Sequence, residues 1–309
     1  MNYTLRQLHV FLKINETRSI TKAAQELHLS QPAVSIMMKN FQDHFEIPLT
    51  EVIGRKLYIT DFGKEIAAAA ENIIHQVNSI THKTSAYAGK LQGTLKLSSV
   101  STGKYLMPYF LKDFLKKNEG VDLVLDVTSK GKVIKSLQKN QVDFSLVSIL
   151  PDHVLIGTEE ILKNQLFLVG NSDFEMPTEP LHPMILEDHQ LILREAGSGT
   201  RALTEKYLYE NDVVCRKRME LTSNEAVKHA VIAGLGISIM PAVGLKNELA
   251  NGSLKIIPLQ KLPESASWNL IWMTNKSFSP IAEAFLQHIR TEKQRILQTH
   301  FSWLQQYQH

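Results

Sequence analysis

The chain has little of what would mark an exported, membrane-bound or disulfide-stabilised protein. Cys215 is its only cysteine, so no intramolecular disulfide can form, and this composition fits a reducing cytosol. The amino terminus carries charges and lacks the continuous apolar segment of a secretory signal. The longest apolar run, residues 230–245, is broken by glycines and a proline and is shorter than the roughly 20 residues that a membrane span needs. We therefore expect a cytoplasmic protein with no membrane partner.

Excess charge and catalytic motifs are also scarce. The formal net charge is only +3, so any contact with nucleic acid has to be local. The glycine pairs at 197 and 199 and at 234 and 236 are too short for a dinucleotide fingerprint, and neither a P-loop nor a His-Glu-x-x-His pair occurs. The 12 histidines lack ligand spacing. An enzyme and a transport solute-binding protein are the alternatives; we expect neither, and we expect no cofactor and no metal.

Apolar residues at helical spacing predict three helices at the start of the chain. The first covers about residues 4–15, the second lies between Ser19 and His28, and the third is capped by Ser30. Pro32 is tolerated in the first turn of the third helix, where amide hydrogens lack internal partners. Two short helices joined by a tight turn form the motif whose second helix enters the major groove of DNA.

The outward side chains of these helices are candidates for DNA contact. They are Thr21, Gln31, Pro32, Ser35, Ile36 and Lys39. Gln31 can pair bidentately with adenine, and Thr21 and Lys39 are placed for phosphates. The alternative is an ordinary solvated face, because three helices at these intervals occur in many folds unrelated to DNA.

Residues 48–59 are expected to form a small hairpin. Gly54 would make the turn, with Arg55 and Lys56 at the tip. Such a wing can lie along the minor groove and meet its negative potential with a basic tip. An ordinary solvated turn is the alternative.

At this point the sequence resembles the LysR-type transcriptional regulators. The resemblance rests on LRQL at residues 5–8 with Phe11, SITKAA at 19–24, LHLSQPAVS at 27–35, PL at 48–49 and TDFG at 60–63. It implies that Gln31, Pro32, Ser35 and Arg55 occupy the family's DNA-contacting positions. The sequence departs from the family pattern at Ile36, Met37 and Thr50. Apolar Ile36 and Met37 can touch thymine methyl groups, which would alter the bases that are read.

A long helix is expected after the wing, with Thr60 as its cap. Its apolar side chains follow heptad spacing, at Ile66, Ala70, Ile73, Val77 and Ile80. We interpret this seam as a dimer contact, and burial against the same chain is the alternative. The seam covers about two heptads, so other contacts must help to hold the dimer. Similar linker helices pair subunits in LysR-type proteins, and the resemblance favours a tetramer.

From residue 94 onward, predicted strands and helices alternate. This rhythm indicates a mostly parallel sheet, and two α/β lobes with chain crossings near residues 163–167 and 266–270 would resemble the family's effector domain. The expected fold is thus an N-terminal all-α winged helix-turn-helix at 1–59, a dimerising linker helix at 60–89, and a C-terminal α/β effector domain of periplasmic-binding-protein type at 90–309. Within the last, lobe I takes about 90–164 and 269–309, and lobe II about 165–268.

Hydroxyl and arginine side chains gather where the predicted strands end. The candidate effector-binding residues are Ser101, Thr102, Thr128, Ser129, Ser148, Arg194, Ser198, Thr200, Arg201 and Ser223. In parallel sheets ligands lie beyond the carboxyl ends of strands, where helix N-termini favour anions. We therefore expect a small anionic effector. The alternative is that the serines and threonines only cap helices and that the arginines form structural ion pairs.

Residues 191–201 resemble the same segment of LysR-type regulators of sulfur or carbon assimilation, whose effectors are often small anions. The expected function is therefore sequence-specific transcription regulation in response to such an effector. The expected partners are double-stranded promoter DNA, further copies of the chain and the effector, with RNA polymerase as a further candidate.

Overall fold

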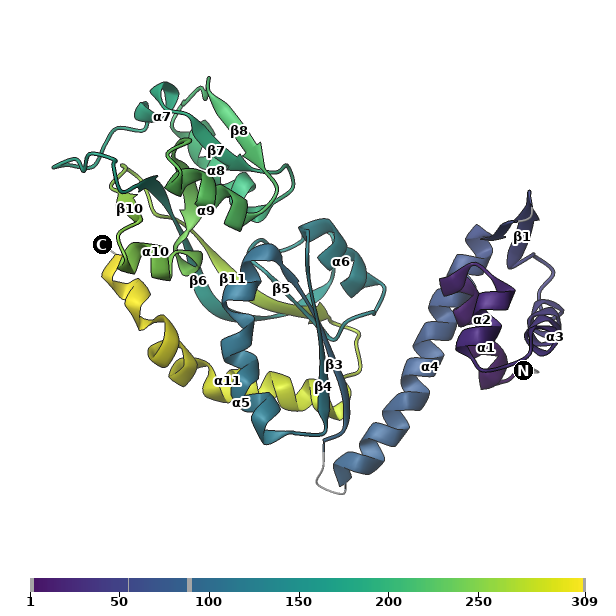
Figure 1. Cartoon of the computed structure of the whole chain (residues 1–309). Coiled ribbons are helices and arrows are strands. Elements are labelled where there is room, and N and C mark those ends of the chain that lie inside the picture. The colour runs from purple at the N-terminus through teal and green to yellow at the C-terminus, as the bar shows by residue number, and fades with distance from the viewer. Residues whose placement is uncertain (1–2, 55, 88–90, 308–309) are drawn as a thin grey trace. The chain divides into compact units, whose positions relative to one another are not determined.

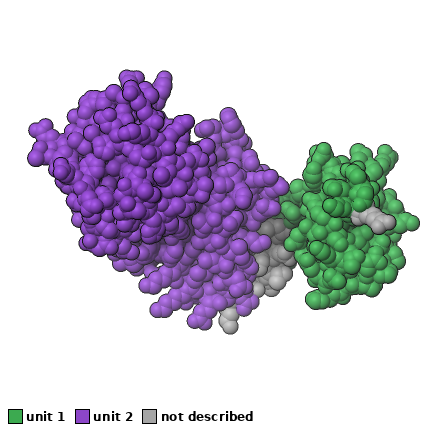
Figure 2. All heavy atoms as spheres, turned by 45° about the horizontal axis from the view of Figure 1, so that its top comes forward, with its two compact units in different colours: residues 1–89 green, residues 90–309 purple. Residues whose placement is uncertain are grey.

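The computed structural model describes residues 3–54, 56–87 and 91–307. The chain forms two compact units, residues 1–89 and residues 90–309, which Figure 2 shows in different colours. None of the helices in the described part of the chain is both long enough and apolar enough to cross a membrane.

The first unit is a helical cluster followed by a hairpin and a long helix (Figure 1). Its elements are α1 (Leu5–Thr17), α2 (Ile20–Glu26), α3 (Gln31–Gln42), β1 (Thr50–Ile53), β2 (Lys56–Ile59) and α4 (Asp61–Tyr87). Thr4 caps α1 through a capping box with Gln7. Apolar side chains from α1, α2, α3 and the first turns of α4 form one core around Phe11 and Phe41. The antiparallel β1–β2 hairpin makes this unit mainly, but not purely, helical.

The second unit is built on a mixed sheet of seven strands. The strands are β3 (Gly93–Val100), β4 (Val121–Thr128), β5 (Phe144–Val147), β6 (Ile156–Asn171), β9 (Ser238–Pro241), β10 (Leu254–Ile257) and β11 (Glu264–Met273). Their order in the sheet is β10-β6-β11-β5-β3-β4, and β9 also pairs with β6. β3 is parallel to β4 and β5. The pairs that involve β6 or β11 are antiparallel, so the expectation of a mostly parallel sheet is wrong.

Two lobes flank the long β6–β11 ribbon. In lobe I, β3, β4 and β5 pack with the helices η1 (Ser101–Tyr105), α5 (Met107–Lys117), α6 (Lys130–Gln138), α11 (Pro280–Phe301) and η3 (Ser302–Tyr307). Lobe II holds a two-stranded parallel sheet, β7 (Leu191–Arg194) with β8 (Arg218–Leu221), and the helices α7 (Ile185–Asp188), α8 (Gly199–Glu210), α9 (Asn224–Ile232), η2 (Ala242–Gly244) and α10 (Lys246–Ala250). The C-terminal tail joins the core of lobe I, because Phe301 and Leu304 are buried there.

The lobes are connected twice, by the strands β6 and β11. These strands pair from Glu264 opposite Leu166 to Met273 opposite Ile156, with an irregular register between Trp268 and Asn269. Both strands are longer than their apolar stretches indicate, because residues 156–165 and 264–269 carry polar side chains on a partly exposed ribbon. This double connection places the ends of β3, β4, β5 and β7 near one another.

Candidate nucleic-acid interface and ligand cleft

The N-termini of α2 and α3 are both capped by short-range hydrogen bonds. Ser19 Oγ accepts from the Lys22 amide at 3.3 Å, and Ser30 Oγ accepts from the Ala33 amide at 3.4 Å. His28 adopts a φ of 53°, a left-handed conformation that lets the chain reverse between the two helices. Two capped helices at a tight turn therefore form as the sequence predicts.

One face of α3 is buried and the other is open. Val34, Met38 and Phe41 are buried in the core of the unit. The predicted DNA-contacting residues lie on the open side: Thr21, Gln31, Pro32 and Lys39 are exposed, Ser35 is half-buried, and Ile36 is 60% exposed. Ile36 thus adds one apolar side chain to an open face that is otherwise mainly polar.

The hairpin that follows presents a further basic residue. Gly54, at a φ of 55°, makes the turn, and Lys56 is exposed at the start of β2. Arg55, the other predicted wing residue, lies outside the described residues. A groove of about 720 Å³ runs beside the hairpin, with Arg18, Lys56 and Lys64 among its lining residues. A polyanion is the partner for which this set of cations is suited.

The predicted seam of α4 is divided by the structure. Ala70 is only 1% exposed, and half-buried Ile66 packs against the same core, so this end of the seam belongs to the unit itself. Further along, Ile73 is 40% exposed, Val77 is half-buried and Ile80 is 66% exposed. The seam positions that are exposed or half-buried within this unit are therefore Ile73, Val77 and Ile80.

A cleft of about 510 Å³ lies between the two lobes of the second unit. Eight of the ten predicted effector-binding residues line it: Ser101, Thr102, Thr128, Ser129, Ser148, Arg194, Ser198 and Thr200. Their elements converge because the carboxyl ends of β3, β4 and β5 in lobe I face the end of β7 and the first turn of α8 in lobe II. An anion in this cleft would meet hydroxyl groups from both lobes.

The hydroxyl groups of the cleft differ in how far they are already engaged. Thr102 and Thr200 are 6% and 7% exposed, and Ser129 stands at the N-cap of α6 without a side-chain capping bond. Ser198 does cap its helix, since its Oγ accepts from the Arg201 amide at 3.0 Å. Gly199 makes the first turn of α8 approach lobe I closely, because a Cβ on it would lie 2.8 Å from Ser148 Oγ.

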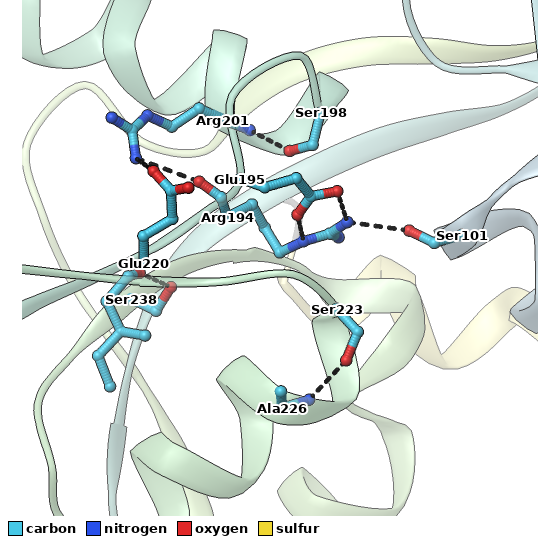
Figure 3. A network of polar contacts seen from close by, with 10 residues as sticks. Ser101, Arg194, Glu195, Ser198, Arg201, Glu220, Ser223, Ala226 and Ser238 are labelled. Carbon is cyan, nitrogen blue, oxygen red and sulfur yellow. Dashed lines mark hydrogen bonds and ion pairs between the residues drawn. The ribbon is translucent and has the colours of Figure 1, made fainter. Parts of the chain in front are cut away.

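Arg194 is the buried cation of the cleft. It is 4% exposed, and its Nε and Nη2 donate to the two carboxylate oxygens of Glu195 at 2.7 Å each. Nη2 also donates to Ser101 Oγ at 3.2 Å, across the gap between the lobes (Figure 3). The same guanidinium thus connects the lobes and carries an internal carboxylate.

Two predicted residues do not line the cleft. Arg201 turns away from it, with Nε on Glu205 at 2.6 Å and Nη1 donating to the Arg194 carbonyl at 3.1 Å. Ser223 caps α9 by accepting from the Ala226 amide at 3.1 Å. Arg201 thus forms an ion pair and Ser223 caps a helix, which are the structural alternatives to effector binding that the sequence left open.

Three polar lining residues escaped the sequence analysis: Lys130, Glu195 and Thr222. Each of the three is next in the sequence to a predicted cleft residue: Ser129, Arg194 or Ser223. Their place at the end of a strand was therefore a usable signal. Lys130 forms no ion pair among the residues that the structure describes and is the cation that lobe I brings to the cleft.

A second set of polar contacts joins the lobes beside the cleft. The hydroxyl of Tyr105 in lobe I donates to Glu225 in lobe II at 2.5 Å, and Lys104 lies 3.3 Å from the same carboxylate. Lys228, buried in lobe II, lies 3.0 Å from Glu225 and 2.8 Å from Glu248. We call these five residues the interlobe network. All of them except Glu225 line a cavity of about 290 Å³ that the C-terminal segment also lines.

Burial and hydrogen bonding shift the pKa values within the interlobe network. Burial alone would raise the pKa of Glu225, but hydrogen bonds from Tyr105 and Lys228 lower it to about 2. Burial, followed by the bond to Glu225, raises the pKa of the Tyr105 phenol well above its usual range. Near neutral pH the Glu225 carboxyl is therefore ionised, and the Tyr105 phenol keeps the proton that it donates to Glu225. Among the described residues, no group of three or more His, Cys, Asp or Glu side chains is arranged to hold a metal ion.

Both units match known protein families. Residues 5–64 match the family described as bacterial regulatory helix-turn-helix protein, lysR family, and residues 88–294 match the LysR substrate binding domain. The "RuBisCO operon transcriptional regulator" of Acidithiobacillus ferrooxidans is 34% identical over 93% of each chain. The "HTH-type transcriptional activator CmpR" of Synechocystis sp. is 33% identical over 93% of this chain and 95% of its own.

Solved structures agree with these matches. The regulatory domain of Synechocystis CcmR, solved in complex with 2-PG, has a TM-score of 0.63 and 30% identity, and the alignment covers 65% of this chain and 98% of that one. Full-length CbnR complexed with target DNA has a TM-score of 0.65 at 20% identity, over 93% of this chain and 99% of that one, which supports the fold. The fold class expected from the sequence is confirmed.

Proposed function

The chain belongs to the LysR family of bacterial transcription regulators, and we propose that a small anion bound between its two lobes changes how it acts at its DNA site. The observation that carries this proposal is the cleft itself, where Arg194, Thr102 and Thr200 meet from two lobes with little exposure. An anion between the lobes would accept hydrogen bonds from hydroxyl groups of both lobes and from a guanidinium, whose bonds to anions are charge-assisted.

We assign DNA recognition to residues 1–59. Gln31 and Ser35 on the exposed face of α3 would read base edges, and Ile36 would contact a thymine methyl group. Pro32 would shape the start of this helix, while Thr21, Lys39, Arg55 and Lys56 would contact the backbone or the minor groove. The departure at Ile36 supports a base preference of its own at that position.

We assign pairing of subunits to residues 60–89 and effector binding to residues 90–309. Ile73, Val77 and Ile80 would pack against their equivalents in a second copy, with further pairing through the second unit to a tetramer. A regulator of this kind acts where the genome lies, which places it in the cytoplasm. RNA polymerase is the further partner that transcription control requires.

The relatives suggest the chemistry of the effector. One relative is named a RuBisCO operon transcriptional regulator, and another is named the transcriptional activator CmpR. The CcmR domain was solved with 2-PG, a small anion. We propose that this chain takes an effector of the same class, one that carries a phosphate or carboxylate group. The lining residues support this, since they offer two cations and several hydroxyl groups.

Ligand binding to the full-length chain tests the proposal. We expect 2-PG or inorganic phosphate to raise the unfolding temperature of the second unit by several degrees at about 100 times its dissociation constant, since this adds roughly 2.7 kcal/mol. Thr102→Val removes a cleft hydroxyl at nearly constant volume and should weaken binding at least about fivefold.

The matched control is Thr204→Val. Thr204 is 2% exposed and donates to the Thr200 carbonyl at 2.9 Å, but it does not line the cleft. Its replacement should leave ligand affinity unchanged. Equal weakening by both substitutions would mean that the effect is one of folding, and no response to any of the anions would remove the cleft from the proposal.

A further inference from the structure

The buried arginine of the cleft is already bound to a carboxylate of its own chain. Two parallel hydrogen bonds of 2.7 Å join the Arg194 guanidinium to Glu195, in the bidentate geometry that an anionic ligand would use (Figure 3). The remaining donor contact of Nη2 goes to Ser101 at 3.2 Å. An incoming anion thus finds its strongest donor occupied.

Glu195 has room to leave this position. Its side chain is 27% exposed, whereas that of Arg194 is 4% exposed. The turn that follows is exposed at Ala196 and Gly197, and there is open space around Gly197, whose φ is 86°. The carboxylate can therefore move into water without displacing packed atoms, while the arginine stays in place.

We propose that Glu195 is an internal competitor for Arg194, so that an anion binds well only if a second anionic group offsets the displacement of Glu195. The inference rests on the proposed function, because it concerns the same cleft. A ligand anion on the Arg194 guanidinium would lie beside the Glu195 carboxylate, and repulsion between the two like charges favours displacement of Glu195. A ligand with one anionic group replaces one ion pair with another and gains little.

The second anionic group has a partner in lobe I. Lys130 lines the cleft and forms no ion pair within the described part of the chain. An anion that reaches both Lys130 and Arg194 gains a new ion pair in addition to the one it replaces, and it links the two lobes. Displacing Glu195 costs every such anion the same free energy, and only an anion with two anionic groups offsets this cost at Lys130.

The test is Glu195→Gln in the full-length protein, with acetate, inorganic phosphate and 2-PG as probes in titration calorimetry. Glutamine keeps the size of the side chain but removes the charge. A hydrogen bond to a charged group exceeds a neutral one by roughly a factor of five to ten in binding constant. We expect acetate, phosphate and 2-PG each to bind Glu195→Gln about five- to tenfold more tightly than the wild type.

Glu205→Gln is the matched control. Glu205 Oε1 accepts a hydrogen bond from Arg201 Nε at 2.6 Å, and neither residue lines the cleft. Removing the charge of Glu205 should therefore leave the affinities for the three probes unchanged. Weaker binding by Glu195→Gln would show that Glu195 positions Arg194 and does not compete. Unchanged affinities in a wild-type protein that binds the probes would overturn this inference alone. If neither the wild type nor Glu195→Gln binds any of the three probes, both the proposed function and this inference fail.

Discussion

Gln31 and Lys39 lie on one exposed face of α3 but differ in what they can recognise. An amide can form two specific hydrogen bonds with an adenine edge, whereas an ammonium group binds any phosphate equally. Both side chains are exposed, so neither contributes to the core of the unit. This pair therefore allows base reading and backbone contact to be separated without loss of the fold.

We predict that Gln31→Ala weakens binding to the cognate site by about 1–3 kcal/mol and binding to random DNA far less. Lys39→Ala should weaken binding to both and flatten the dependence of affinity on salt by about one counterion. Fluorescence anisotropy with cognate and scrambled duplexes over a salt series measures both effects. Equal losses on both duplexes for Gln31→Ala would exclude it as a base reader.

At the same scale, the serines show which side chains a sequence can assign. Ser198 and Ser223 cap the helices that follow them, and both bonds span three residues. Ser101 receives its bond from Arg194, a partner 93 residues away. All three serines lie where a predicted strand turns into a helix. Their neighbours in the sequence therefore do not show which serine caps a helix and which one lines the cleft.

At the scale of elements, α4 has two roles along its length. Its first turns complete the core around Phe11 and Phe41, and Ala70 is buried there. Beyond that point Ile73 is 40% exposed. The heptad spacing is continuous through both regions, and it predicted a seam without indicating which neighbour would cover each part.

We predict that Ile73→Asp weakens subunit pairing, because a charge in an apolar contact between helices loses its hydration. Ala68 is exposed on another face of the same helix, so Ala68→Asp serves as the control. Sedimentation of the wild type and both variants over a concentration range measures the effect. A dimer of unchanged affinity in Ile73→Asp would assign pairing to other parts of the chain.

At the scale of the whole second unit, the interlobe network links stability to pH. The pKa of Glu225 falls from about 4.5 to about 2 on folding, through its bonds to Tyr105 and Lys228. Because the folded-state pKa is the lower one, its stabilising contribution is complete above about pH 4.5. It is lost as the pH falls toward 2.

We therefore predict that Glu225→Gln lowers the unfolding temperature at pH 7, and that the difference from the wild type narrows between about pH 5 and pH 2. Thermal unfolding of the full-length chain at stepped pH checks this. Glu119→Gln, at an exposed position, should follow the wild type throughout. A difference that stays constant with pH would show that the carboxylate charge of Glu225 is not the source of the stability.

Local features of the fold were accessible from the sequence because the interactions that produce them are local. The caps at Thr4, Ser19 and Ser30 bind amides three residues away, and the apolar spacing of α1, α3 and α8 lies within each helix. These patterns predicted the helix-turn-helix and the hairpin, whereas the LysR-type assignment and the two-lobed unit came from the family resemblance.

What the sequence alone determined, then, is most of the elements with their order, and the hydroxyl-rich strand ends; the short elements α7, β9, α10 and β10 were not predicted. Tertiary structure decided the antiparallel pairing of β6 with β11, the burial of Ala70, and the contacts of Arg194 and Tyr105. Tyr105 and Glu225 are 120 residues apart, and no local pattern encodes their meeting. Such contacts form only when the double crossing brings the lobes together, because their free energy depends on burial that the finished fold creates.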